Sequence, residues 1–206
     1  MRILIISLII SLSCLNQKNN NLIINYKINN QNSECTELKI QINDKIRIYQ
    51  YYKNDSIFME SINNLRELPV NFITPSVSDE IIKINFDSIK MVNFLEMITL
   101  KNTNETNVIL GYNCEKYVFG TKDFPLGEVY FIKGKKVKHS FLSDIFKSSD
   151  KIPLKIKAYG GVEYTAIDIN FNGDEITSNI SNQTVNNKEI EGIEMLIQDT
   201  YKFFRP

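Results

Sequence analysis

The stretch Leu38–Ile48, LKIQINDKIRI, decides the fold that this sequence predicts. Its apolar residues alternate with polar ones, which is the period of a strand that buries one face and exposes the other. Asn43-Asp44 lies between two such runs and suits a tight hairpin turn. By the same alternation we expect Arg47, which is flanked by two isoleucines, to face water.

The period of two continues along most of the chain. Further alternating runs cover residues 82–86, 108–114, 117–119, 129–131, 154–158 and 162–171. The phase changes between Cys114 and Tyr117, which predicts either a bulge near 114–116 or a break between two strands. No long helical segment separates the runs, so we expect antiparallel rather than parallel pairing.

Turns and loops are predicted where this alternation stops. Lys133-Gly134 predicts a second hairpin turn, and Gly160-Gly161 predicts another turn. Residues 60–79 lack clear alternation and contain two prolines, so we expect a loop that crosses the sheet. The polar stretch 172–188 also predicts a loop.

Two segments have helical patterns. Residues 143–149 suit one or two turns, and residues 187–204 repeat apolar side chains at helical spacing. The fold predicted for residues 21–206 is therefore a mainly β (α+β) domain. We expect a strongly curved antiparallel sheet or incomplete barrel, closed by the C-terminal helix.

The N-terminus has the pattern of an export signal. A positive start precedes the apolar run Ile3–Leu12, which would span roughly 15 Å as a helix and is too short to cross a bilayer. Small residues Ser11 and Ser13 suit cleavage before Cys14. We therefore interpret residues 1–13 as a signal peptide and 14–20 as a polar tether. Cys14 is either lipidated or the first residue of an unmodified secreted protein.

Composition excludes several kinds of site. Lys+Arg and Asp+Glu are both 24, and this balance is not typical of nucleic-acid-binding proteins. There is one His and there are three Cys, too few for a histidine-rich metal site or a four-cysteine zinc site. His139 has no partner at the spacing of a catalytic dyad, so we predict no enzyme activity, no cofactor and no metal.

Other reactive and charged residues have ordinary interpretations beside functional ones. Cys35 and Cys114 either form a disulfide in an oxidising compartment or remain thiols, with Cys114 buried in a strand. The lysine-rich run 133–138 either meets acidic lipid headgroups or is a solvated turn. Tyr49, Tyr51 and Tyr52 form either an exposed aromatic patch or part of the core.

A resemblance to known proteins rests on residues 109–119, ILGYNCEKYVF. This segment resembles the ILGYxCxKY strand of small secreted proteins of unknown function from Gram-negative bacteria, including a family named for its GLPGLI motif. Residues 151–156, KIPLKI, are similar to the related G-x-P-L-x-I pattern but lack both glycines of GLPGLI. The resemblance implies a layout like the periplasmic carriers LolA and LolB: a curved sheet lined with apolar side chains.

Two functional hypotheses follow. The first is a non-enzymatic envelope protein, periplasmic or extracellular and either free or anchored to the outer membrane through Cys14. It binds an acyl chain or a lipoprotein segment in the curved sheet. The second is an envelope interaction or structural protein with no small ligand, which predicts an exposed aromatic patch or sheet edge. Nucleic acid is a partner in neither hypothesis.

The signal predicts the mass of the mature chain. We expect protein exported by a Gram-negative host to begin at Cys14, and intact-mass spectrometry will read its N-terminus. A diacyl or triacyl addition that disappears in Cys14→Ser identifies an anchored protein, whereas an unmodified Cys14 identifies a free one. Retention of residues 1–13 would contradict the signal-peptide interpretation.

Overall fold

The computed structural model describes residues 21–30, 35–43, 45–64, 70–74, 78–84, 98–137 and 150–173. These ranges contain eleven strands. They are β1 Leu22–Asn29, β2 Glu37–Ile42, β3 Ile46–Lys53, β4 Ser56–Asn64, β5 Val70–Thr74, β6 Ser78–Ile84, β7 Thr99–Ile109, β8 Tyr112–Gly120, β9 Pro125–Lys136, β10 Lys151–Ala158 and β11 Glu163–Asn170. The signal, the tether and the predicted helices at 143–149 and 187–204 lie outside the described residues.

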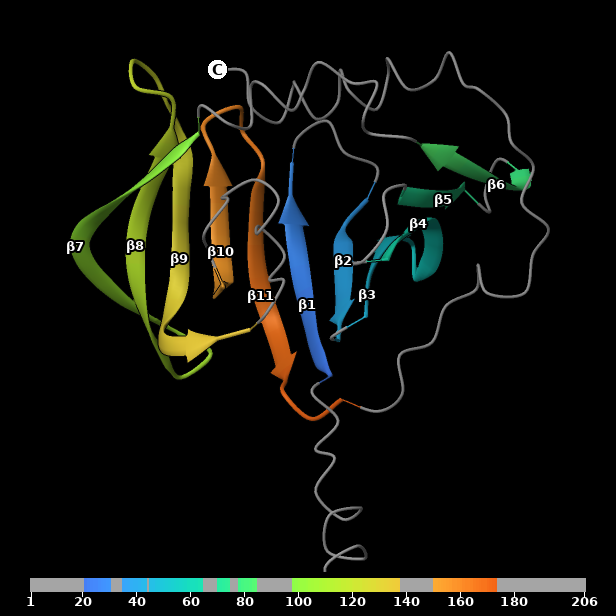
Figure 1. Cartoon of the computed structure of the whole chain (residues 1–206), viewed down its shortest axis with the longest axis horizontal. Helices are drawn as coiled ribbons and strands as arrows, with labels where there is room; N and C mark the ends of the chain where they lie inside the picture. Colours follow the sequence, from blue (N-terminus) through green and yellow to red (C-terminus); the bar gives the residue numbers. More distant parts are fainter. Residues whose placement is uncertain are drawn as a thin grey trace, which may run out of the picture.

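All eleven strands form one open antiparallel sheet, so the protein is mainly β. The order is β6-β5-β4-β3-β2-β1-β11-β10-β9-β8-β7, with β6 and β7 at the two edges. Each half is a meander of sequence neighbours, and the halves meet where β1 pairs with β11 (Figure 1). Within the described ranges, no helix is long and apolar enough to cross a membrane.

Two predicted turns are confirmed. The β2–β3 hairpin forms where Asn43 was expected to turn the chain, and the Asn43 side chain accepts hydrogen bonds from the amides of Lys45 (2.7 Å) and Ile46 (2.8 Å). The β10–β11 turn places Gly161 at φ +93°, and the Gly161 amide donates to the Ala158 carbonyl. Glycine is favoured at a positive φ such as this one, because it has no Cβ that would clash with the backbone.

Two other loop predictions are wrong. Lys133-Gly134 is not a hairpin turn, because β9 runs through it, although Gly134 does have φ +74° and the register with β10 shifts nearby. Residues 60–79 are not a crossing loop, because β5 pairs with β4 and with β6. Only β6 of these strands lies at an edge of the sheet; β4 and β5 are paired on both sides.

The break predicted near Cys114 is wrong, but a register irregularity is present there: the pairing of β8 with β7 shifts between Asn102↔Tyr117 and Thr106↔Glu115. β8 is one strand, and its register with β9 is continuous from Cys114↔Ile132 to Phe119↔Gly127. Cys114 and Ile132 belong to one apolar cluster, whereas Phe119 and Val129 belong to a second. Alternate residues point to opposite faces, so β8 and β9 bury one face at one end and the other face at the other end.

Gly127 is a point of close packing between β9 and its two neighbours. A Cβ added there would lie 2.4 Å from the Lys157 carbonyl oxygen and 2.6 Å from the Phe119 ring. Only glycine therefore lets β9 approach both neighbours.

We predict that Gly127→Ala lowers the free energy of unfolding by about 2 kcal/mol, because the methyl group has no room. The matched control is Gly134→Ala, where a Cβ meets nothing within 4 Å. Its cost should be about 1 kcal/mol, from the positive φ alone. Urea denaturation measures both changes, and equal losses in the two variants would contradict the packing explanation.

Candidate functional site

The first candidate surface is an apolar face that crosses the centre of the sheet. Strand register places Tyr51, Leu38, Tyr26 and Ala166 in one row across β3, β2, β1 and β11. The next row continues from β1 to β8. It contains Ile28, Tyr164, Ile156, Val129 and Tyr117. We call these two rows the apolar face.

Burial affects three tyrosines on this face, Tyr26, Tyr51 and Tyr164. The Tyr26 hydroxyl donates to the Pro153 carbonyl at 2.6 Å, so the polar end of a fully buried ring is satisfied. Burial raises the pKa of Tyr26 and Tyr164 well above the usual 10, and raises the pKa of Tyr51 to about 12. Desolvation disfavours the phenolate, so these groups stay protonated at physiological pH.

Cys35 and Cys114 are not joined by a disulfide. Cys114 is fully buried, and its thiol is 3.5 Å from the Tyr112 carbonyl oxygen. Burial raises the pKa of Cys114, so it is a small core residue rather than a reactive thiolate. Cys35 packs against the core close enough to Tyr51 and Tyr164 to interact electrostatically with both.

The prediction that Arg47 faces water is wrong. Arg47 is 1% exposed and pairs in register with Ile42, so it shares a face with the core of β2. Its guanidinium lies 5.5 Å from the centre of the Tyr49 ring, a cation–π distance. Alternation misassigned this residue because Ile48, on the other face, is also fully buried. Both faces of β3 are therefore covered.

The face that carries Ile48 also buries a polar row. Gln41, Gln50 and Glu60 are each at most 5% exposed. The Gln41 amide donates to Gln50 at 3.2 Å, and the Gln50 amide donates to the Glu60 carboxylate at 2.6 Å. The sequence analysis did not predict this hydrogen-bonded row across β2, β3 and β4, because alternation treats a polar residue between apolar ones as solvated.

The three tyrosines proposed as an exposed patch do not form one. Tyr49 and Tyr51 pack against the core on the side of Arg47, and Tyr52 lies on the opposite face by alternation. Tyr52 is half-buried, and its hydroxyl donates to Gln50 at 3.2 Å. The second functional hypothesis therefore loses its aromatic patch.

A titratable cluster joins β7, β8 and β10. The Tyr117 hydroxyl donates to Glu115 at 3.1 Å and accepts from the Asn102 amide at 3.2 Å. The Lys151 ammonium donates to the same hydroxyl and lies 3.5 Å from Glu115. The charges neutralise one another, and the cluster contains neither a histidine nor a thiol.

A surface depression and possible metal ligands are the remaining candidates for a site. A shallow depression of about 450 Å³ lies beside the β10–β11 turn and is lined by Asn29, Lys157 and Glu163 among others. Within the described ranges, no three His, Cys, Asp or Glu side chains converge as metal ligands. His139 and Cys14 lie outside the described residues.

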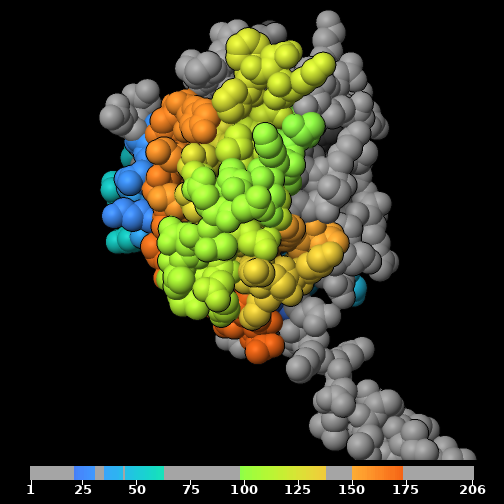
Figure 2. Space-filling model, turned by 90° about the vertical axis from the view of Figure 1, so that its left-hand side faces the viewer, coloured from blue at the N-terminus to red at the C-terminus, as the bar shows by residue number. Residues whose placement is uncertain are grey.

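The exposed edge strand β7 protects its own backbone. The Asn104 amide donates to the Asn102 side chain at 2.7 Å, the Glu105 amide to Thr103 at 3.3 Å, and the Val108 amide to Asn107 at 2.8 Å. Asn104 also has φ +61° at a register shift, and the residues of β7 lie on the face turned to the viewer in Figure 2. These features discourage another strand from pairing here.

Comparisons with known proteins find likeness only in structure. No family model matches the chain, and no curated protein matches it. Two solved structures of PNGF-II, in the P21 and C2 space groups, have TM-scores of 0.55 and 0.56 at 17% identity. The matches cover 88% and 87% of this chain. The chain spans about a third of PNGF-II, 34% and 33%, and the likeness shows a shared fold.

The buried tyrosines predict an alkaline limit to stability. Between pH 10 and about 12 the unfolded chain loses phenolic protons that the folded chain retains, so the free energy of unfolding falls as pH rises. Below pH 10 this contribution is fully present. Denaturant titrations from pH 8 to 12 should show a shallower decline for Tyr51→Phe than for the wild type. The exposed-residue control Tyr159→Phe should keep the wild-type slope; a Tyr51→Phe slope equal to it would count against the tyrosine explanation.

Proposed function

We propose that this chain is a non-enzymatic cell-envelope protein that binds an acyl chain or an apolar lipoprotein segment against the apolar face. The observation that carries the proposal is the continuity of this face through seven strands, β3 to β8 in sheet order, of a sheet that is not closed. An open sheet can admit a long apolar ligand without breaking strand pairing. The proposal includes a curved, incomplete barrel with the helix predicted at 187–204 as its cover.

The chemistry of the face suits an acyl chain. The Tyr26 hydroxyl is already hydrogen-bonded to Pro153, so its ring presents apolar atoms to its neighbours. Each methylene group removed from water contributes about 0.8 kcal/mol without any directional contact. A lining of isoleucine, leucine and tyrosine therefore retains a fatty chain while remaining tolerant of its identity.

The alternative is an envelope interaction or structural protein with no small ligand. This alternative predicts an exposed aromatic patch or an exposed sheet edge. The described residues support these two features less than they support the apolar face. Tyr49 and Tyr51 pack in the core, and β7 satisfies three of its own amides. The geometry therefore favours the ligand-binding proposal.

Location completes the proposal. The signal predicted at 1–13 supports a location in the periplasm or outside the cell, and Cys14 would supply an outer-membrane anchor if it is lipidated. The neutral balance of the chain is compatible with partners that are apolar rather than highly charged.

Native mass spectrometry with lipid extraction tests the proposal on the full chain exported by its own leader. We expect released lipid from wild-type protein, and less from Ala166→Phe, because this variant adds a ring to the apolar face at a 3%-exposed position. The matched control is Thr165→Phe, which adds the same ring to the opposite face.

Thermal unfolding separates loss of ligand from loss of fold in these variants. A folded Ala166→Phe protein that carries as much lipid as Thr165→Phe contradicts the assigned face. If wild-type protein carries no lipid and takes up no added palmitate, the ligand-binding proposal is wrong and the interaction or structural protein is favoured.

A further inference from the structure

One end of the sheet brings the start of β1 together with the β7–β8 turn. The Gly173 amide donates to the Asn21 carbonyl at 3.1 Å, which ties the residues after β11 to the residue before β1. Phe171 packs edge-on against Tyr112 at 5.9 Å, and the Lys135 ammonium lies 3.7 Å from the Phe171 ring centre. The chain therefore enters the sheet beside the turn that precedes Tyr112.

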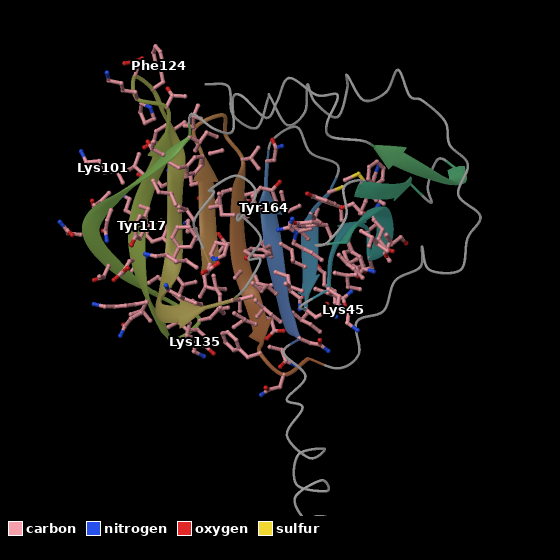
Figure 3. All side chains as sticks on the ribbon, viewed as in Figure 1. Lys45, Lys101, Tyr117, Phe124, Lys135 and Tyr164 are labelled. Atoms are coloured by element: carbon pink, nitrogen blue, oxygen red, sulfur yellow. The ribbon has the colours of Figure 1, made fainter. Side chains whose placement is uncertain are left out.

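This end carries exposed apolar and basic side chains, and we call it the basic end. Its members are Val108 and Leu110 at the β7–β8 turn, Lys133, Lys135 and Lys136 on β9, and Lys45 in the β2–β3 turn. Lys45 and Lys135 lie at the same end of the sheet, opposite Phe124 (Figure 3).

Two features of Leu110 are unfavourable: its backbone conformation and the exposure of its apolar side chain. Its φ is +51°, in the left-handed region that leucine rarely adopts, and Gly111 follows at φ +77°. A hairpin turn with two such residues favours Asn-Gly. Leu110 is also 42% exposed, and its neighbour Val108 is 62% exposed. A strained residue that also exposes apolar surface points to a function at this turn.

The charges at this end are mostly positive. Lys133 is 3.9 Å from Glu115, and its side chain remains 64% exposed. Glu115 is shared with Lys151, so one carboxylate faces two ammonium groups. Asp150 is an exposed acid beside this group, and its carbonyl accepts the Val137 amide. The four lysines of the basic end therefore outnumber the acidic residues that the structure describes beside them.

We propose that the basic end docks on the surface of an anionic phospholipid bilayer. Leu110 and Val108 enter the headgroup region, and the exposed lysines contact lipid phosphates. The polar tether leads into β1 at this same end, so docking would set the sheet upright on the membrane that holds Cys14. The inference rests on the envelope location in the proposed function and is independent of what the apolar face binds.

Vesicle flotation tests the contact without the anchor. The protein is the full chain exported by its own leader and carrying Cys14→Ser, so that no acyl chain is attached. We expect binding to vesicles of phosphatidylcholine with 30% phosphatidylglycerol, weak binding to pure phosphatidylcholine, and release as salt screens the charges. Equal binding to both vesicle types, or none to either, overturns the proposal.

Charge variants test the lysines. Lys133→Gln with Lys136→Gln should lower the partition coefficient by roughly 25-fold, since each lysine near an anionic surface contributes about fivefold. Lys101→Gln with Lys122→Gln removes the same charge elsewhere and is the matched control. If both pairs lose binding equally, attraction by overall charge replaces a specific basic end.

Leu110→Asn gives a test in which stability and binding change in opposite directions. Asparagine suits the left-handed conformation, so the melting temperature should rise by a few degrees. Loss of the apolar side chain should lower vesicle binding about tenfold. Phe124→Asn, at a 70%-exposed position on the opposite end, should leave binding unchanged.

A Leu110→Asn protein that binds vesicles as the parent does removes the turn from the proposal. Lipid extraction of the same samples distinguishes ligand binding by the apolar face from membrane docking by the basic end. If both proposals are correct, the Leu110→Asn protein loses vesicle binding but keeps its co-purified lipid. Protein that carries no lipid and still floats with anionic vesicles contradicts only the ligand-binding proposal.

Discussion

The pairing of β1 with β11 is the interaction on which the rest of the sheet depends. It joins two meanders that are each built from sequence neighbours, and it covers seven residue pairs from Ile23↔Asn170 to Asn29↔Glu163. Every row of the apolar face crosses this ladder. A slip of one residue would turn the inward side chains of one half toward the other face. The buried Tyr26, whose hydroxyl reaches across β11 to Pro153 on β10, helps to fix the register.

Burial on both faces is the second constraint on the fold. β8 and β9 bury Cys114 and Ile132 on one face and Phe119 and Val129 on the other. The same pattern appears at β3, where Arg47 and Ile48 are both fully buried. A strand covered in this way contributes to two apolar layers. This arrangement gives the sheet its continuous apolar face and also leaves little of its centre exposed.

The sequence was sufficient for the class of fold and for the central hairpins, because local alternation and turn residues determine both. Asn43 and Gly161 act where their chemistry predicts. Alternation could not assign Arg47 or the Gln41–Gln50–Glu60 row, because a polar residue covered from both sides follows the same period as a solvated one. The sequence offered the lysine run 133–138 as a contact for acidic headgroups, but not its position beside the β7–β8 turn, since Lys135 and Tyr112 meet Phe171 only through long-range packing.

The self-bonded edge of β7 has a consequence for how the sequence can change. Asn102, Thr103 and Asn107 each accept a hydrogen bond from a backbone amide of this edge strand. Substitutions there would leave the core intact, so a stability screen would tolerate them. They would nevertheless uncover donors on an unpaired strand, which is a template for chain-to-chain association. Selection at these surface positions would therefore act on solubility at high concentration, and a lineage that lost these side chains would be prone to polymerise while remaining well folded.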